Sequence, residues 1–321
     1  MPAMSLLRTL LLPLLLLAGG VAAAADCPPS APDLRQLPMD ELRAKARDRG
    51  VLWKLQKDGR TSWLYGTVHV GRPEWMVPGP RTVAALRGAD LVALELDPAD
   101  PELARVLTRP GDPARAQRVL DGLLARVQRQ ARRACLPEEQ LAALRPMLQV
   151  VTLSMMQGRQ EGLHPEYGMD IFLYGLARRL RKEVLALETP ATQLAALQPE
   201  SEADERVLIE RSLEDMESGV AERQLDGLMQ AWATGDADRL SRYREWCDCL
   251  KTPAEERFFR RLNDARNPGM ADKLAAAHEG GRRVFAAVGA LHMTGPKALQ
   301  TLLRERGFTV ERVPFPSPDR P

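Results

Sequence analysis

The chain has 321 residues, of which 45% are hydrophobic and 27% are charged, and its formal net charge is +2. A disordered chain would need lower hydropathy and a larger net charge, so this composition is that of a globular protein of one large domain or two. So small a net charge gives no general affinity for nucleic acid or acidic membranes, and nucleic acid is therefore not an expected partner.

Residues 1–25 have the pattern of a secretory signal peptide. Arg8 precedes the apolar run Leu10–Leu17, and Ala22–Ala25 supply small residues for cleavage. A transmembrane anchor fits less well, because the run is short and contains Pro13. We therefore expect an exported protein, periplasmic or secreted, with no membrane span in the mature chain.

The predicted export changes the interpretation of the four cysteines, Cys27, Cys135, Cys247 and Cys249. An even set in an oxidising compartment predicts disulfides, and four cysteines allow three connectivities. A Cys247–Cys249 bridge would close a tight, strained ring. We therefore expect these two cysteines to pair with Cys27 and Cys135, although the sequence does not fix the connectivity.

The mature chain is expected to begin with an extension over residues 26–50 that is rich in proline and ends in a short helix, Met39–Arg49. Asp40 is the expected N-cap of that helix. Two β-forming runs, Val51–Gln56 and Thr61–His69, then flank an Asp-Gly pair, which predicts a β-hairpin.

Two later strands end alike. Asp90–Pro98 contains Leu-Val-Ala-Leu-Glu, with Glu95 near its carboxyl end, and Lys182–Thr189 contains Val-Leu-Ala-Leu-Glu, with Glu188 in the same place. The first is expected to be a buried strand, because its apolar run is continuous rather than alternating, and the second is a further strand of similar sequence.

The middle of the chain has a helical period. We expect a short helix, Arg81–Leu86, before this region. Within the region we expect a helix over Ala114–Arg133, a second after Pro137 that Pro146 kinks or splits, and a third over Gly168–Arg181. Further helices are expected over Thr192–Lys273, with breaks at Pro199, Gly219, Gly235, Pro253 and Pro268. The end of the chain predicts strands over Arg282–Gly289 and Phe308–Pro314 around a helix, Pro296–Arg306.

Strands at both ends with helices between them predict one α/β domain. We expect a mixed central β-sheet over residues 51–314, with a large helical insertion at about 101–275, and a disordered tail at 315–321.

Two of only four histidines occur in matching contexts. One strand ends in Gly66-Thr67-Val68-His69 and another in Gly289-Ala290-Leu291-His292. Glycine permits close approach of the backbone, and strand ends face the crevice that open α/β sheets use for ligands. We expect His69 and His292 to meet at one site.

Glu95 and Glu188 add carboxylates to the strand ends. Burying an ionised carboxylate costs several kcal/mol unless a cation or hydrogen-bond donors compensate, so we expect a metal or an arginine beside Glu95. Glu188 either shares that environment or points to solvent. Two imidazoles and a carboxylate would make an open site for a divalent cation and an activated water.

The combination resembles the TraB/GumN-like (TraB/PrgY/GumN) family, whose distant relatives include the Tiki metalloproteases. It also takes in Arg266-Asn267 before a helix, Gly168-Met169-Asp170 at the start of another, and Gly295, and it covers roughly Val51–Val313. The resemblance implies an EreA/ChaN-like α/β fold in which both Gly-x-x-His motifs and the glutamate form the active site. In the Tiki branch that site supports metal-dependent peptide cleavage, although this chain lacks the Tiki membrane anchor.

On this interpretation His69, His292 and Glu95 bind the metal, Glu188 or Glu95 is the general base, and Arg266 binds developing negative charge. Manganese, cobalt, zinc and iron all suit imidazole and carboxylate ligands, so the ligands do not choose the metal. The further pocket candidates are Tyr65, Gly66, Asp170 and Gly289, of which Asp170 is more readily a helix cap and Tyr65 is equally a strand aromatic. His164 and His278 are expected to be structural.

The predicted function is an exported metal-dependent hydrolase of the peptidase type, with a peptide or small-molecule substrate. The alternative is a non-catalytic envelope protein that holds a metal or haem in the same cleft. A third hypothesis is an assembly factor built on an inactive hydrolase fold. The sequence does not determine the oligomeric state.

Overall fold

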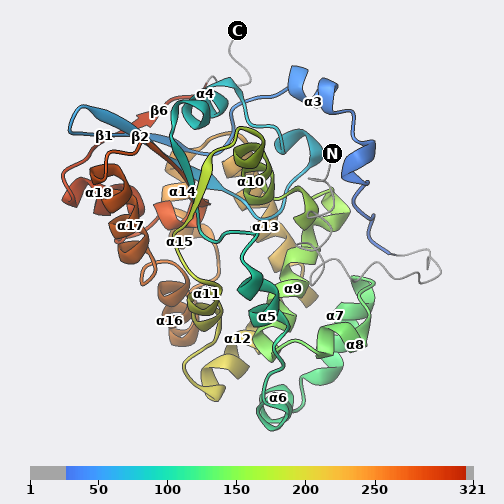
Figure 1. Cartoon of the computed structure of the whole chain (residues 1–321). Coiled ribbons are helices and arrows are strands. Elements are labelled where there is room, and N and C mark those ends of the chain that lie inside the picture. Colours follow the sequence, from blue (N-terminus) through green and yellow to red (C-terminus); the bar gives the residue numbers. More distant parts are fainter. Residues whose placement is uncertain (1–26, 316–321) are drawn as a thin grey trace. The chain divides into compact units, whose positions relative to one another are not determined.

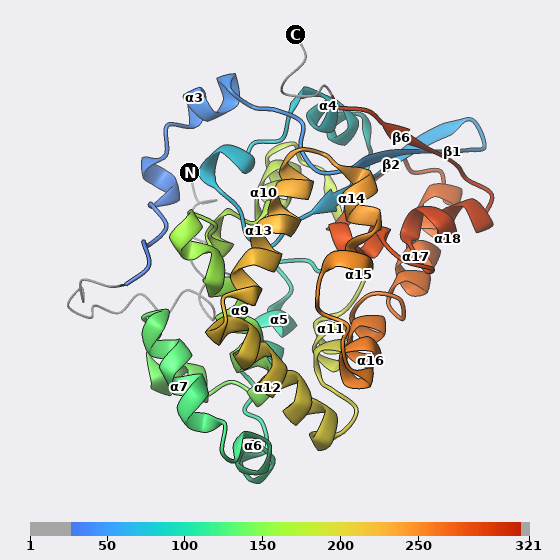
Figure 2. The same ribbon diagram turned by 180° about the vertical axis from the view of Figure 1, so that it is seen from behind.

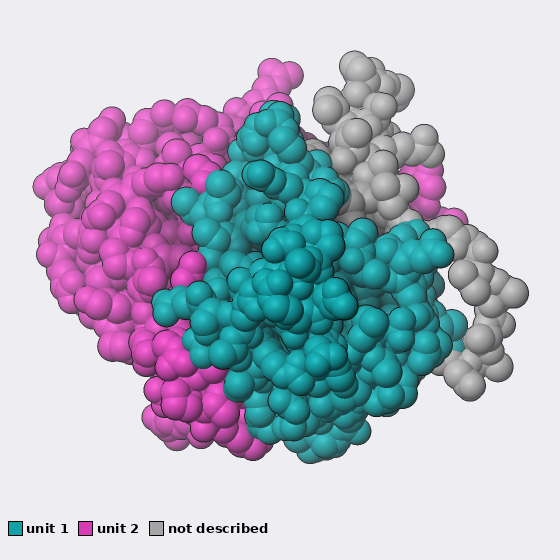
Figure 3. All heavy atoms as spheres, turned by 90° about the horizontal axis from the view of Figure 1, so that it is seen from below, with its two compact units in different colours: residues 1–30, 98–161, 190–223 teal, residues 31–97, 162–189, 224–321 magenta. Residues whose placement is uncertain are grey.

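The computed structural model describes residues 27–315 (Figure 1). The predicted signal peptide and residues 316–321 of the predicted tail lie outside the described residues. The chain divides into two compact units (Figure 3). Among the described residues, unit 1 comprises residues 27–30, 98–161 and 190–223, and unit 2 comprises residues 31–97, 162–189 and 224–315.

A six-stranded mixed sheet forms the centre of unit 2, with strand order β4-β3-β5-β2-β1-β6. The four strands β4, β3, β5 and β2 are parallel, whereas β1 is antiparallel to both β2 and β6. The predicted mixed α/β fold is therefore confirmed. The strands are β1 (Leu52–Lys57), β2 (Arg60–Thr67), β3 (Leu91–Leu94), β4 (Glu183–Ala186), β5 (Val284–Gly289) and β6 (Thr309–Val313).

The predicted hairpin joins β1 and β2. Lys57 pairs with Arg60 across the turn, and both turn residues, Asp58 and Gly59, have positive φ, 50° and 70°. Two left-handed residues define the turn type whose twist matches that of two paired strands. The Asp-Gly pair therefore sets the register of the strand that leads to His69.

Helices cover both faces of this sheet. Alternate β5 residues, Val284, Ala286 and Val288, belong to one apolar core with α17 (Asn267–Glu279) and α18 (Leu299–Glu305). Helix α10 (Met169–Arg179) lies on the other side of β5 (Figures 1 and 2). Because successive side chains of a strand point to opposite faces of the sheet, β5 packs against a helical layer on each face.

The other helices of unit 2 are short. The prediction of a helix over Met39–Arg49 capped by Asp40 is wrong in detail, because α3 ends at Ala44 and its N-cap position is Pro38, which places Asp40 in the first turn. In that position the negative charge of Asp40 still stabilises the helix, because it lies near the positive end of the helix dipole. The remaining helices are α4 (Pro80–Gly88), α14 (Ala237–Ser241), α15 (Tyr243–Trp246) and α16 (Pro253–Leu262), and α13 (Val220–Ala233) begins in unit 1 and ends in unit 2.

Unit 1 consists of helices. The helix predicted over Ala114–Arg133 is two helices, because Gly122 between them has φ of +71°. Pro146 splits its region as predicted, and the break predicted at Pro268 lies just before it, since α16 ends at Leu262 and Pro268 is in the first turn of α17. The helices are α5 (Pro101–Thr108), α6 (Pro113–Leu120), α7 (Leu124–Arg133), α8 (Glu138–Ala142), α9 (Pro146–Met156), α11 (Pro190–Leu197) and α12 (Glu202–Glu217).

The expected disulfide pairing is wrong. Cys27 is bonded to Cys135, with Cα atoms 5.7 Å apart, and Cys247 is bonded to Cys249, with Cα atoms 5.1 Å apart. The short ring closes because Asp248 has φ of 52°, which turns the chain and brings the flanking Cα atoms within disulfide range. Among the residues that the structure describes, no helix is long and apolar enough to cross a membrane.

Candidate active site

Four predicted site residues lie at one edge of the sheet of unit 2. His69, Glu95, Glu188 and His292 each follow the carboxyl end of a parallel strand, β2, β3, β4 and β5 respectively. Parallel strands end at the same edge, which is where open α/β sheets bind ligands. The strand order therefore sets the sequence of groups along the edge as Glu188, Glu95, His292 and His69.

Glu95 is held on both carboxylate oxygens. Oε1 accepts a hydrogen bond of 2.7 Å from the backbone N–H of Gly289, and Oε2 accepts one of 2.5 Å from Arg266. Burial alone would raise the pKa of Glu95, but the charges of His292, Arg266 and His69 hold this pKa well below its usual range. Glu95 is therefore ionised at neutral pH although it is buried.

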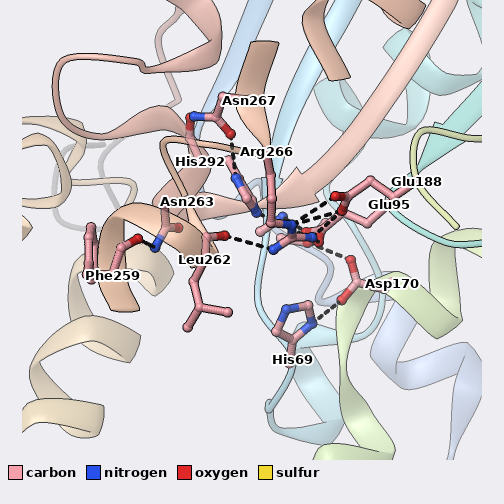
Figure 4. A network of polar contacts seen from close by, with 12 residues as sticks. His69, Glu95, Asp170, Glu188, Phe259, Leu262, Asn263, Arg266, Asn267 and His292 are labelled. Carbon is pink, nitrogen blue, oxygen red and sulfur yellow. Dashed lines mark hydrogen bonds and ion pairs between the residues drawn. The ribbon is translucent and has the colours of Figure 1, made fainter. Parts of the chain in front are cut away.

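Arg266 bridges the two glutamates (Figure 4). Its Nε lies 3.0 Å from both oxygens of Glu188, and one Nη contacts Glu188 and Glu95 together. Burial lowers the pKa of Arg266, and the hydrogen bonds and charges of Glu188 and Glu95 raise it above its ordinary value. The expected arginine beside Glu95 is thus present, and these donors are engaged by protein carboxylates.

His292 is oriented by Asn267, the first residue of α17. Asn267 donates from Nδ2 to the backbone carbonyls of His292 and Lys297, at 3.0 Å and 2.7 Å, so its Oδ1 faces Nδ1 of His292 at 2.5 Å. Because an amide oxygen only accepts, Nδ1 carries the hydrogen. In the neutral ring the lone pair is therefore on Nε2, which lies 3.7 Å from Oε2 of Glu95.

His69 is oriented in the same way by Asp170. Its Nδ1 lies 2.8 Å from Oδ2 of Asp170, whose other oxygen accepts a hydrogen bond of 2.6 Å from the hydroxyl of Thr67. The Asp170 carboxylate is the main cause that raises the pKa of His69 to about 9. The expected capping role of Asp170 is not observed, because the N-cap of α10 is Gly168 and no side chain caps it.

Gly289 leaves the space between these groups open. A Cβ atom placed on Gly289 would lie 3.2 Å from Oε1 of Glu95, 3.7 Å from Nε2 of His69 and 3.7 Å from Cδ2 of His292. Both imidazoles and the carboxylate therefore border one small volume. Any side chain at position 289 would project into it.

The donors suit a divalent cation, although their present spacing does not form a closed site. Over residues 27–315, no three His, Cys, Asp or Glu side chains are already spaced to hold a metal ion. Each imidazole nevertheless has its Nδ1 hydrogen directed at an oxygen acceptor, which is how proteins orient metal-binding histidines. His69 has 63% of its side chain exposed, whereas His292 has only 5% exposed, so His69 is the less tightly packed of the two imidazoles.

Two pocket candidates lie elsewhere. Tyr65 is in the core, where its ring stacks on Phe285 and its hydroxyl donates to the Arg49 carbonyl. Gly66 serves close packing, because a Cβ there would lie 2.8 Å from Val51 and 3.2 Å from Ala290.

The remaining histidines are structural, as expected. His278 bonds Ser62 at Nδ1 and the Lys57 carbonyl at Nε2, at 2.8 Å and 3.0 Å. His164 is buried against Tyr167.

The sequence assigned no role to Thr67 or Asn267. Thr67 belongs to the first Gly-x-x-His motif, and Asn267 follows Arg266, so both stood inside recognised motifs. Their partners, Asp170 and His292, lie 103 and 25 residues away, and no local pattern indicates such pairs.

The chain is similar in sequence to known proteins. The TraB/PrgY/gumN family model matches residues 51–312. The uncharacterized protein YbaP of Shigella flexneri is 29% identical over 260 residues, which cover 76% of this chain and 88% of that protein. YbaP of Escherichia coli (strain K12) is 28% identical over 256 residues, with 75% and 87% covered. No solved structure matches the chain significantly.

Proposed function

The chain belongs to the TraB/PrgY/gumN family, and from that premise we propose that it is an exported metal-dependent hydrolase that cleaves peptides. The observation that carries the proposal is the shared volume above Gly289. Two imidazoles and the ionised Glu95 border it, and each imidazole has its Nδ1 hydrogen directed at an oxygen acceptor. Such donors suit manganese, cobalt, zinc or iron.

In this proposal His69 and His292 would hold the cation through Nε2, and Glu95 would hold it through a carboxylate oxygen. A divalent cation supplies Lewis acidity and makes a water molecule nucleophilic at neutral pH. Asp170 and Asn267 keep the two rings in the ligating tautomer.

The two glutamates have different roles. A general base works best when its pKa is near the working pH, and the pKa of Glu95 is held far below neutrality. Glu95 also borders the volume above Gly289 and is therefore the ligand, which leaves Glu188 as the candidate base. Arg266 contacts both carboxylates and lies next to Glu95, where its positive charge would also stabilise negative charge that develops on a substrate.

Export is part of the proposal. It is supported by the Arg8 and Leu10–Leu17 pattern, and by the bridging of all four cysteines, because disulfides persist in oxidising compartments such as the periplasm.

A non-catalytic protein that holds a metal or haem is the second candidate. The observation that favours it is the engagement of both glutamates by Arg266, which leaves neither carboxylate without a protein cation beside it.

The test is metal content and hydrolysis of a peptide library by the purified mature protein, with His69→Ala, His292→Ala and the exposed control Glu41→Ala. Loss of bound metal and of hydrolysis in both histidine variants, with Glu41→Ala unchanged, is the expected result. Unchanged metal and activity in both would end the proposal. Bound metal or a haem spectrum without hydrolysis would instead establish the second candidate.

A further inference from the structure

A basic surface lies at the edge of the sheet opposite the candidate site. Helices α4, α10 and α17 end there, and each leads through a turn into the amino end of a parallel strand, β3, β4 and β5 respectively. The last turns of these helices and the residues that join them to the strands carry seven basic residues and three acidic ones, Asp90, Glu183 and Glu279, of which Glu279 pairs with Lys57. We call the seven the amino-edge surface: Arg87, Arg178, Arg179, Arg181, Lys182, Arg282 and Arg283.

The three turns are fastened to one another. Lys182 donates to the backbone carbonyls of Arg87 and Ala89, at 3.0 Å and 2.5 Å, which joins the first two turns. Arg282 donates to Glu183 at 2.9 Å, and the backbone N–H of Arg283 donates to Asp90 at 2.8 Å, which ties in the third. The basic residues therefore share one surface although they are far apart in sequence.

Most of the charge on this surface is not neutralised by the protein. Asp90 and Glu183 pair with Arg283 and Arg282. Arg87, Arg178, Arg179 and Arg181 are all exposed, and none of the four makes an ion pair within the described part of the chain. The formal net charge of the whole chain is only +2, so the excess positive charge at this edge is balanced by negative charge elsewhere in the chain.

Helix-dipole stabilisation accounts for only part of the pattern. A cation in the last turn of a helix is favourable, and Arg87, Arg178 and Arg179 occupy such positions. Arg181 lies beyond the end of α10, with φ of 54°, and Arg282 and Arg283 lie beyond the end of α17. The effect falls off within one turn, so it does not explain these three.

We propose that the amino-edge surface docks the protein on a membrane with anionic headgroups. A guanidinium group can donate two parallel hydrogen bonds to one phosphate group. Basic residues on three turns of one surface can therefore contact several lipid headgroups at once. No Phe, Tyr or Trp lies within residues 87–91, 178–183 or 279–284, which disfavours stacking on the bases of single-stranded nucleic acid. Docking by this edge leaves the opposite edge, with His69 and His292, facing away from the membrane.

The proposal is independent of hydrolysis and is tested by co-sedimentation of the mature protein with vesicles of phosphatidylcholine, alone or with phosphatidylglycerol. Each basic residue near an anionic surface is worth roughly a fivefold change in partition. The variant with Arg87, Arg178, Arg179 and Arg181 all changed to glutamine should therefore bind at least about a hundredfold more weakly. Binding of the unmodified protein should also fall steeply between low and high salt.

The control changes four exposed arginines on other elements, Arg47, Arg109, Arg133 and Arg223, to glutamine, and it should retain most of the binding. Equal loss in both variants would show an effect of net charge alone and overturn the proposal. So would binding to phosphatidylcholine alone, or binding to duplex DNA as tight as to the vesicles. If the variant with four substitutions does not fold, the double variant Arg178→Gln/Arg179→Gln replaces it. Its vesicle binding and the salt dependence of that binding then test the proposal.

Discussion

His292 donates a hydrogen bond from Nδ1 to Oδ1 of Asn267, 2.5 Å away, while the amide nitrogen of Asn267 donates to the carbonyls of His292 and Lys297. One amide thus fixes both the tautomer of a histidine and the loop that carries it. Because Asn267 is fully buried, water molecules cannot replace these hydrogen bonds if its side chain is removed.

Replacement of Asn267 by alanine should destabilise the protein by about 1–3 kcal/mol, because it leaves buried polar groups without partners. It should also permit the hydrogen of His292 to move to Nε2. Urea unfolding measures the first effect, and nitrogen chemical shifts of the imidazole measure the second. A ring that keeps its hydrogen on Nδ1 in the alanine variant would contradict the role given to Asn267.

Replacement of Arg266 by methionine should cost about 3–5 kcal/mol at pH 7, because it leaves the buried carboxylates of Glu95 and Glu188 together without their cation. Two adjacent carboxylates raise the pKa of one of them, so the variant should regain stability as the pH falls and a proton binds. Urea midpoints at pH 7 and pH 5 test this. The companion Arg266→Met/Glu188→Gln should show a smaller loss and a weaker dependence on pH.

Gly289→Ala should leave the fold intact, at a cost of about 1–3 kcal/mol for crowding, while it abolishes binding of added Mn²⁺. The new methyl group would lie between Glu95, His69 and His292. Calorimetric titration with Mn²⁺ and thermal unfolding measure the two effects.

The matched control for that variant is Gly175→Ala in α10, where a Cβ meets nothing within 4 Å. Removing a glycine from a helix interior should stabilise the protein by about 0.5–1 kcal/mol and leave Mn²⁺ binding unchanged. Retention of Mn²⁺ binding by Gly289→Ala would show that the volume above Gly289 is not the binding site.

The two disulfides should differ in their effect on stability. In the loop-entropy model a bridge over about 100 residues is worth about 4–5 kcal/mol, and Cys27–Cys135 spans 108. Cys247–Cys249 spans 2, and its removal should cost much less on the same account. Urea unfolding of the two double-serine variants compares them, and an equal loss would refute the difference.

All four tyrosines should ionise late. Burial raises the pKa of Tyr167 and of Tyr243 to about 12, and it also raises the pKa of Tyr65 and Tyr174. A raised folded-state pKa gives stability that is complete below the unfolded value, near 10, and is lost as the pH rises toward 12. Absorbance at 295 nm should therefore show little ionisation at pH 10 in the folded protein and about half in urea.

The sequence by itself determined the α/β fold class and the residues brought to one edge of the sheet. Asp-Gly between two β-forming runs dictated the hairpin, and two Gly-x-x-His motifs with two Leu-Glu strand ends named His69, His292, Glu95 and Glu188. These are local signals, and parallel strands carry such residues to one edge whatever else the chain does. The expected arginine beside Glu95 followed from the cost of burying a charge.

Only the tertiary structure decided how those residues are held. Asp170 reads as a helix cap in sequence, yet packing of α10 directs its carboxylate to His69. Asn267 gains its role from a residue on another element, and Cys247–Cys249 closes because Asp248 adopts a left-handed conformation. Such contacts join elements far apart in sequence or depend on one backbone angle, so no periodicity or spacing encodes them.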